Sequence, residues 1–489
     1  MAREYVLTDR QPQLLYRYFE DISAIPRVSG NEEAAASYVK EIAGKHGLWC
    51  HEDELHNVLV RKPGSPGFEN LPSVLLEGHL DIVGAKRPES DHDFAKDPIR
   101  LIAEGNILHA DGTTLGADNG CAVAIMLKIL TDKSLIHPPL ECLFTVQEEV
   151  GLVGAKYFDA SLIQSRRAIG LDAGAEGVFR KGTSTKYEMT ACLPVRREPV
   201  SGKAYCLEVS GLRGGDQGAG IPREQICAIK MTARVLHHLN KELDVRLSSV
   251  HKTGKSIPSD CASHIVLVAG EERRMMEILE EQQRQIREEY AQSDPGICIC
   301  ARPEPDMPDM LLKEDSKRLV NALYLMPYGA RNRSLSRLDE VSCSVITKKI
   351  YTDQEGICIF TVISAEERCQ GEALDEEMKT FVQTFGFHIR DTNVNRGWEW
   401  ERVSPIRDIM VKTYEELFHR MPKVNISHGG NDCVVLKEKI PDLDVITTAA
   451  TYVDYHTPKE WLDMDSFERV LELVEGVLKN LTRQVSGAQ

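Results

Sequence analysis

The sequence predicts an α/β fold whose main domain is interrupted by an inserted α+β domain. Three observations predict this organisation. Apolar strands and amphipathic helices alternate in residues 1–182, a pattern of half-exposed strands and helices replaces them in 183–395, and the alternation returns in 396–489. Alternation of this kind is typical of a sheet covered by helices on both faces. We therefore expect one discontinuous α/β domain, 1–182 with 396–489, and an inserted domain, 183–395.

The first segment contains helical periodicity and short apolar runs in turn. Helices are expected at 14–22, 31–46 and 121–130, and strands at 73–76, 140–146 and 167–171. The strands are followed by glycine, histidine or acidic residues. In open α/β sheets the ligand site lies outside the carboxyl ends of the strands, so polar residues at these places are candidates for function.

The inserted segment begins with strands expected at 187–193 and 203–209, followed by an amphipathic helix at 224–241. A similar strand-and-helix pattern returns in 263–292 and 342–382, which suggests an internal duplication. The apolar stripe of 224–241 can be explained by a dimer interface or by packing on its own sheet, and we favour packing. The last segment is expected to contain a helix at 406–418, a strand at 444–448 and a helix at 464–481.

Composition excludes several classes of protein. The chain has 489 residues and a net charge of −16, which disfavours nucleic-acid binding. It contains no apolar run of about 18 residues, the length that a membrane span needs. The first residues have no signal-peptide or transit-peptide character, and a cytoplasmic protein is expected. The 13 cysteines are scattered without a zinc-knuckle spacing, so we expect reduced thiols.

Five histidine and acidic positions follow the predicted strands or begin the predicted helices: His79, Asp118, Glu149, Asp172 and His456. Each one alone has a structural explanation, such as a helix N-cap for Asp118 or a hydrogen-bonded partner for His79. Together they form a mixed nitrogen and oxygen ligand set, which suits zinc, with cobalt or manganese as substitutes. The set predicts a site for two divalent metal ions that share one carboxylate.

Two further acidic residues lie beside these ligands. Asp81 is two residues after His79, on the same side of an extended chain, so it can accept a hydrogen bond from the second imidazole nitrogen. Glu148 precedes Glu149, and two adjacent carboxylates repel unless a cation or a proton separates them. We expect Glu149 to bind metal and Glu148 to act as the general base. A solvated acidic turn is the alternative for this pair.

Four motifs carry a resemblance to a known family: GHLDIV at 78–83, GADNG at 116–120, EEVGLVGA at 148–155 and LD at 171–172. They resemble those of the aminoacylase/carboxypeptidase clan of metallopeptidases. The strings AIPRVSGNEE at 24–33 and LKEKIPD at 436–442 resemble the aminoacyl-histidine dipeptidases of that clan more narrowly. The similarity runs through nearly the whole chain and is strongest in the expected α/β domain.

The resemblance implies a zinc-peptidase α/β catalytic domain with an inserted lid. It implies that one metal takes His79, Asp118 and Asp172, and that the other takes Asp118, Glu149 and His456. Asp81 would orient its histidine and Glu148 would be the base, so both are expected catalytic residues. Lids of this family often dimerise, which makes a homodimer one expectation. The expected partner is a small peptide or amide substrate.

The chain departs from the family where substrate is bound. Asp216, in LRGGDQG at 212–218, stands where the family usually has a histidine that binds the substrate carbonyl. The stretch 360–365 has no counterpart of the usual arginine that holds the dipeptide carboxylate. The usual His-Ala-Gly-Leu-Glu is His428-Gly-Gly-Asn431-Asp432. We expect substrate contacts at Asp216, His428, Asn431 and Asp432.

Three functions are compatible with this pattern. The first is a dinuclear metallopeptidase that cleaves dipeptides, of the Xaa-His type or broadly. The second is an amidohydrolase on the same scaffold with altered specificity, for amides that lack a free carboxylate or that bear a positive group. The third is a metal-binding pseudoenzyme. We favour the first, because a site without catalysis would not need Glu148 beside a complete ligand set.

Overall fold

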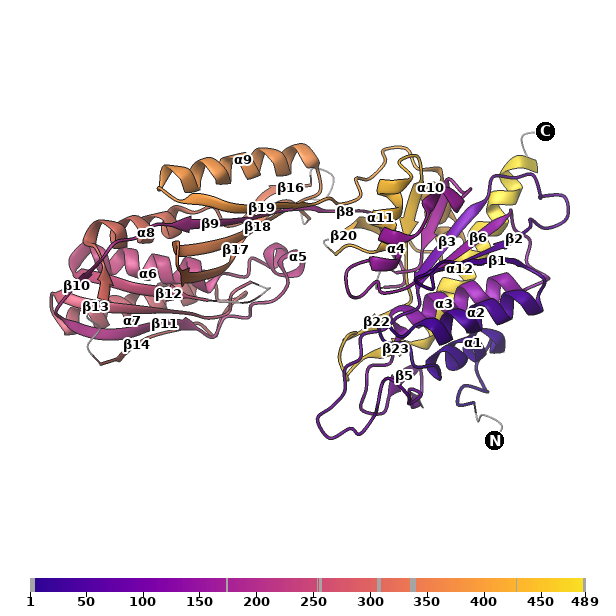
Figure 1. Ribbon diagram of the computed structural model, residues 1–489, viewed down its shortest axis with the longest axis horizontal. Coiled ribbons are helices and arrows are strands. Elements are labelled where there is room, and N and C mark those ends of the chain that lie inside the picture. The colour runs from indigo at the N-terminus through magenta and orange to yellow at the C-terminus, as the bar shows by residue number, and fades with distance from the viewer. Residues whose placement is uncertain are drawn as a thin grey trace. The chain divides into compact units, whose positions relative to one another are not determined.

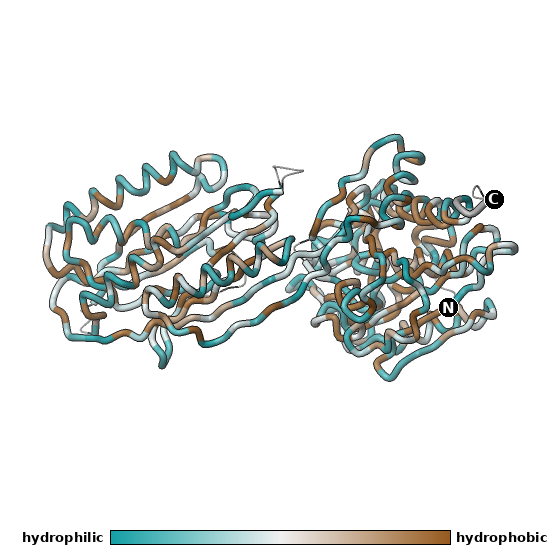
Figure 2. Tube along the Cα trace, turned by 90° about the horizontal axis from the view of Figure 1, so that it is seen from above, coloured by the Kyte–Doolittle hydropathy of each residue, from teal (hydrophilic) through white to brown (hydrophobic). Residues whose placement is uncertain are grey.

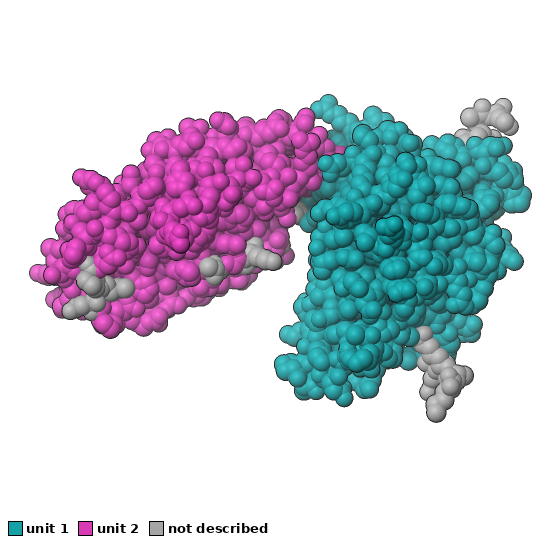
Figure 3. Space-filling model, in the orientation of Figure 1, with its two compact units in different colours: residues 1–183, 400–489 teal, residues 184–399 magenta. Residues whose placement is uncertain are grey.

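The computed structural model describes residues 5–172, 175–252, 254, 257–305, 309–334, 340–427 and 429–486. The chain divides into two compact units (Figure 3). Unit 1 comprises Met1–Thr183 and Trp400–Gln489, and unit 2 comprises Ser184–Glu399. The second boundary lies four residues after the expected 395/396. The chain after the last strand of unit 2 stays attached to that unit, because the Gly397 N–H donates to Thr185 Oγ1 at 3.0 Å.

Unit 1 is built on an eight-stranded sheet with the order β1-β2-β6-β3-β7-β21-β8-β20. Its strands are β1 (Trp49–Glu52), β2 (Val58–Lys62), β3 (Val74–His79), β6 (Leu140–Thr145), β7 (Arg167–Gly170), β8 (Val178–Thr183), β20 (Lys423–Ser427) and β21 (Asp444–Thr447). The central strand β3 runs parallel to β6 and β7. Every residue of β3 and β6 is buried, as expected for strands that are covered on both faces.

Helices pack against this sheet (Figure 1). They are α1 (Gln13–Ser23), α2 (Glu33–Lys45), α3 (Ala117–Thr131), α4 (Val153–Tyr157), α10 (Pro405–Phe418), α11 (Asp432–Lys439) and α12 (Met464–Ser486). Helix α3 contacts α1, α2 and β3, and all of its residues are buried. A small sheet of unit 1 has the order β22-β23-β5-β4. Its strands are β4 (Leu101–Glu104), β5 (Ile107–Ala110), β22 (Tyr452–Val453) and β23 (Trp461–Asp463).

Unit 2 contains two repeats with the same connectivity, each made of a sheet and two helices. One is formed by β11 (Lys203–Ser210), α6 (Ala228–Glu242), β12 (Asp244–His251), β13 (Cys261–Ala269), α7 (Glu272–Glu289) and β14 (Cys298–Pro303). The other is formed by β9 (Thr185–Leu193), α8 (Lys313–Leu325), β17 (Val341–Asp353), β18 (Gly356–Ala365), α9 (Arg368–Thr384) and β19 (His388–Asn395). Each reads β-α-β-β-α-β, a known supersecondary arrangement.

The strand orders support an internal duplication. The first sheet has the order β12-β13-β11-β14, and the second has β17-β18-β9-β19 with β16 (Gly329–Arg333) added beside β17. In both, the second, third, first and fourth strands of the repeat are neighbours in that order. The first repeat is inserted in the second, between β9 and α8. The repeated pattern expected from the sequence is therefore present in the structure.

One expected helix begins later than predicted. The segment before α6 forms a short 3₁₀ turn, Ile221–Arg223, and Glu224 has φ +57°, which ends that turn. The apolar stripe of α6 is nevertheless the predicted one. Ile229, Ala233 and Leu236 are buried in the hydrophobic core of unit 2. The stripe packs on its own domain, which is the explanation we favoured over a dimer interface.

The cysteines differ from expectation at one pair. Cys192 of β9 and Cys358 of β18 are directly opposite in the antiparallel register and form a disulfide. The expectation of reduced thiols throughout is therefore wrong for these two, because their sequence separation of 166 residues concealed the pairing. The other 11 cysteines are free.

Hydrophobic segments run through the interior of each unit (Figure 2). Among the described residues, none of the helices is both long enough and apolar enough to cross a bilayer.

Candidate metal centre

The structure brings together all five residues that the sequence suggested as metal ligands. His79 ends β3, Glu149 follows β6 and Asp172 follows β7. These three strands are parallel, so their carboxyl ends meet at one edge of the sheet. Asp118 stands at the start of α3, and His456 lies in the loop between β22 and β23. A cavity of about 370 Å³ opens at this edge of unit 1.

Asp118 occupies the centre of the group. Its Oδ1 lies 3.3 Å from Nε2 of His79, and its Oδ2 lies 3.3 Å from Nε2 of His456. Each carboxylate oxygen therefore faces a different imidazole. The two histidines hold the pKa of Asp118 below its usual range, although burial alone would raise it. This is the arrangement in which one carboxylate can bridge two cations.

The other two carboxylates each lie against one side of this pair. Glu149 Oε1 is 2.7 Å from His456 Nε2. The side-chain ligand atoms of Asp172, Asp118 and His79 lie within 4.8 Å of one another. The Tyr452 hydroxyl is 3.5 Å from Asp118 Oδ1 and 3.4 Å from Asp172 Oδ1. His79 also lies within 4.8 Å of the ligand atoms of Glu148 and Glu149, so the candidate ligands form one continuous group around Asp118.

Asp81 has a wider structural role than the sequence indicated. His79 Nδ1 is 3.1 Å from the Asp81 main-chain oxygen and 3.4 Å from the carboxylate. The same carboxylate accepts the Ser29 hydroxyl and the backbone N–H groups of Glu148 and Glu149, at 2.8, 3.0 and 3.2 Å. Burial would raise the pKa of Asp81, but the His79 and other hydrogen bonds lower it. Asp81 thus fixes both the imidazole and the acidic turn.

The centre is crowded with like charges. Burial raises the pKa of Glu148 to about 10, and nearby carboxylates add to this against the opposing charge of His79. Burial and the charge of Asp118 raise the pKa of Asp172 to about 7. His456 compensates, because Asp118 and Glu149 raise its pKa to about 10 against the effect of burial. All three shifts favour the protonated form, which adds positive charge to the site. Divalent cations would meet the same need, so the donor set fits a metal centre.

Two buried residues that the sequence did not single out hold the ligand loops in place. The carboxylate of Glu460, 3% exposed, accepts the backbone N–H groups of 115–118 at 2.8, 3.0, 2.9 and 3.3 Å. Arg27, 1% exposed, donates to the main-chain oxygens of Leu80 and Gly116 at 2.7 and 2.8 Å. It therefore joins the loop after β3 to the loop before α3. The sequence offered only a family-like string around Arg27 and no signal for Glu460.

Gly116 is required by this local packing. It has φ +71°, and a Cβ there would lie 2.9 Å from Ile82 Cγ2 and 3.0 Å from Arg27 Nη2. Both the backbone conformation and the close approach exclude a side chain. The glycine-rich string before α3 thus allows the loop to fold tightly enough to present Asp118.

The expected substrate contacts are placed differently from one another. Asn431 lines the cavity and donates from its amide to the Asp172 main-chain oxygen at 2.8 Å. Asp432 is 1% exposed at the start of α11 and does not line the cavity, so the structure places it behind the wall. His428 lies outside the described residues. Asp216 belongs to unit 2, where its carboxylate accepts the Gly218 N–H at 2.7 Å.

The cavity wall also includes residues that the sequence did not suggest. Arg180 and Thr183 come from β8, and Ser427 comes from the neighbouring strand β20. Tyr455 lies beside His456, with a ring-to-ring distance of 4.8 Å. Neither β8 nor β20 was predicted, because their apolar residues are few. The cation on β8 consequently went unnoticed.

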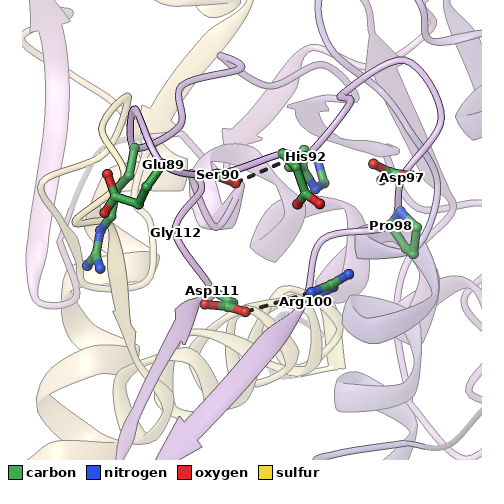
Figure 4. A pocket seen from close by; sticks show the side chains of 10 residues that line it. Glu89, Ser90, His92, Asp97, Pro98, Arg100, Asp111 and Gly112 are labelled. Carbon is green, nitrogen blue, oxygen red and sulfur yellow. Dashed lines mark hydrogen bonds and ion pairs between the residues drawn. The ribbon is translucent and has the colours of Figure 1, made fainter.

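Unit 1 has a second cavity, of about 510 Å³, in the segment 87–112. Figure 4 shows its lining side chains, with Arg100 facing Asp111 across it and Ser90 near His92. None of the five ligand residues lines this cavity. Its charged side chains are of both signs. The chemistry of the chain therefore points to the smaller cavity at the sheet edge.

Comparison with known proteins gives matches among the peptidases. Residues 75–480 match the model of peptidase family M20/M25/M40. The chain is 28% identical to the cytosol non-specific dipeptidase of Escherichia coli K12, over 97% of this chain and 99% of that protein. It superposes on the aminoacylhistidine dipeptidase of Vibrio alginolyticus with a TM-score of 0.87 and 26% identity, covering 97% and 98% of the two chains.

A more distant structure, the aminopeptidase PepT of Bacillus cereus, has a TM-score of 0.55 and 16% identity, over 96% and 98% of the chains, and shares the fold. The expected α/β peptidase fold is confirmed. Because the family model spans more than half of the chain, the chain belongs to peptidase family M20/M25/M40, and it is a metallopeptidase of that family.

Proposed function

We propose that this protein is a dinuclear metal-dependent dipeptidase. The observation that carries the proposal is the position of Asp118, whose two oxygens face His79 and His456 at equal distances of 3.3 Å. One metal would be held by His79, Asp118 and Asp172, and the other by Asp118, Glu149 and His456. Nitrogen and oxygen ligands in this ratio suit zinc, with cobalt or manganese as substitutes.

When bound, the two ions would lower the pKa of a water molecule and polarise the carbonyl of the scissile amide. The chain's own residues would transfer the protons and hold the proton-transferring group in position. Glu148 lines the cavity, and bound cations would lower its pKa again, because a nearby positive charge favours the ionised carboxylate. In that form it would take the proton from the attacking water and pass it to the leaving amine. Asp81 would keep this residue in place, because it accepts the backbone N–H of Glu148 at 3.0 Å.

The substrate class follows from the relatives together with one cation. Two relatives that match over nearly the whole chain carry dipeptidase names, and we propose dipeptides, of the Xaa-His type or broadly, as substrates. Among the described residues that line the cavity, Arg180 is the sole guanidinium or ammonium group. It donates to Asn425 Oδ1. We assign to it the recognition of the substrate carboxylate, since planar guanidinium groups match carboxylates.

This assignment addresses the missing arginine at 360–365. A cation that comes from β8 of unit 1 would replace one from the inserted domain, so free dipeptides remain substrates. We keep Asp216 as a proposed substrate-facing residue on the basis of the resemblance alone. A cytoplasmic location is proposed from the cytosolic relative.

The proposal is tested with the zinc-loaded protein and a panel of dipeptides that includes β-Ala-His and carboxyl-amidated analogues. We expect turnover of free dipeptides, which a chelator abolishes and added zinc restores. Turnover of amidated substrates alone would instead support altered specificity. Two tightly bound metals without turnover of any substrate would support a pseudoenzyme.

Replacing Arg180 by methionine is expected to lower kcat/KM for a free dipeptide by about 10- to 100-fold. A hydrogen bond to a charged group is worth roughly 1.5–3 kcal/mol, and each 1.4 kcal/mol is a factor of ten. The same variant should change kcat/KM for the amidated dipeptide by less than about threefold, because no carboxylate is lost there. Steady-state kinetics on the two substrates measure the difference.

Lys423→Met is the matched control, since Lys423 is exposed on β20, beside β8, and does not line the cavity. It should leave both substrates unaffected. Equal losses on the free and the amidated dipeptide in Arg180→Met would contradict the carboxylate assignment while leaving the dipeptidase proposal intact.

A further inference from the structure

The first sheet of unit 2 carries a cluster of metal-binding side chains on the face that points away from the core. Along β11, Tyr205, Leu207 and Val209 belong to the hydrophobic core of the unit. Side chains alternate between the two faces of a strand, so Cys206 lies on the opposite face. Helices α6 and α7 pack against β11, β13 and β14. Their apolar residues belong to the same core.

Three potential ligands meet on this outer face. Cys206 is directly opposite His264 in the β11–β13 register. Glu304 follows β14, and its N–H donates to the Ala204 main-chain oxygen at 2.9 Å, which extends the pairing of β14 with β11. His264 Nδ1 is 2.7 Å from Glu304 Oε2. The ligand atoms of Cys206, His264 and Glu304 all lie within 4.8 Å of one another.

The cluster is accessible enough to be filled from solvent. The side chains of His264 and Glu304 are 30% and 27% exposed, whereas Cys206 is 9% exposed. The neighbouring cation, Arg302, stands opposite Cys206 in the β11–β14 register, and its guanidinium is paired with Glu208. A histidine–carboxylate contact of 2.7 Å is also found between His456 and Glu149 in the proposed catalytic centre. Both clusters thus contain imidazole nitrogen and carboxylate oxygen donors, and the cluster on the first sheet of unit 2 also contains a sulfur donor.

We propose that Cys206, His264 and Glu304 form a separate binding site for one zinc or similar divalent ion. A thiolate, an imidazole and a carboxylate are three ligands that zinc accepts, and a water molecule can complete the tetrahedron. The Cys206 thiol loses its proton to solvent as the sulfur–metal bond forms, His264 binds through a neutral nitrogen, and Glu304 binds as the carboxylate. No oxidant or reductant is needed.

The expected consequence is structural. In the order β12-β13-β11-β14, β14 is an edge strand. A metal held by residues of β13, β11 and the end of β14 would tie that edge to the middle of the sheet. The alternative is an ordinary His264–Glu304 ion pair beside an uninvolved thiol. That alternative predicts no bond between a metal and Cys206.

Cobalt titration of the full-length protein distinguishes these two cases. A Co²⁺–thiolate bond gives a charge-transfer absorption band in the near ultraviolet, and the proposed catalytic ligands contain no sulfur. The band therefore reports on this cluster whether or not the catalytic centre is filled. We expect a band that saturates at one equivalent of thiolate-bound cobalt per chain, and a metal content higher by one equivalent than that of Cys206→Ser.

The variants make the result specific. The band should disappear in Cys206→Ser, and His264→Ala and Glu304→Gln should weaken cobalt binding at least tenfold. Cys298→Ser is the matched control, since Cys298 is an exposed free thiol on β14 that lies outside the cluster. It should leave the band unchanged. Absence of the band in the wild type, or an unchanged band in Cys206→Ser, would overturn the proposal.

Discussion

Replacing Glu148 by glutamine is expected to lower kcat for dipeptide cleavage by about 100- to 10,000-fold, the usual contribution of a general base. Glutamine keeps the size of the side chain but cannot accept the proton of the attacking water. Glu148 makes none of the ion pairs that join the five ligands, and its carboxylate lies within 4.8 Å of ligand atoms of His79 and Glu149. If it acts as base and not as a ligand, KM and the metal content of the variant stay close to those of the wild type.

The conservative variant separates catalysis from structure. Glu148→Asp keeps a carboxylate but withdraws it from the substrate, so its kcat should lie between those of the wild type and Glu148→Gln. Metal analysis of both purified variants, together with kcat on one free dipeptide, is the measurement. Activity of Glu148→Gln within about threefold of the wild type would rule out the base, and loss of metal from it would reassign Glu148 as a ligand.

The amino-acid sequence contains enough information to locate the centre but too little to show what supports it. The strands that end in His79, Glu149 and Asp172 are continuous apolar runs, and parallel strands bring their carboxyl ends to one edge. A search for acids and histidines at such places therefore finds the ligands. His456 lies in the loop between β22 and β23, so strand ends mark it less directly than the other ligands, and the resemblance assigns it to the second metal.

The supporting residues escape such a search for a physical reason. Glu460 acts through four backbone N–H groups of 115–118, which no side-chain pattern encodes. Arg27 is a buried cation whose partners are main-chain oxygens 53 and 89 residues away. Pairings of this range depend on the folded chain. The same is true of the opposition of Cys192 and Cys358 across two strands.

The secondary structure was likewise predicted only in part from the sequence. Long periodic elements such as α1, α3, α10 and α12 were expected within a few residues of their observed ends. The start of α6 was misplaced because a 3₁₀ turn and the positive φ of Glu224 precede it. Strands β8 and β20 were missed, since neither contains an apolar run and the two pair with each other in the folded sheet. Because β8 was not predicted, Arg180 was not recognised as a residue of the site.

Asp118→Asn is expected to have the largest effect on metal content. Asparagine keeps the shape of aspartate, but one of its two terminal atoms is an amide nitrogen that cannot bind a metal. In the wild type one oxygen faces His79 and the other faces His456, both at 3.3 Å. Either rotamer of asparagine therefore deprives one of the two sites of a ligand, and both sites lose the shared negative charge.

We expect the bound metal to fall from two ions per chain to at most one at the catalytic centre, with kcat/KM lower by more than about 1,000-fold, or about 4 kcal/mol. Tyr452→Phe is the control. It removes only the hydroxyl, which lies 3.5 Å from Asp118 Oδ1, and should retain both ions. Retention of both ions by Asp118→Asn would contradict a bridging role for this carboxylate.

Lowering the pH is a second test of the metal centre, made on the wild-type protein. Asp118 and Glu149 raise the pKa of His456 to about 10 in the absence of metal, and binding requires the neutral imidazole. Protons therefore compete with the metals, and the catalytic ions should be released as the pH falls.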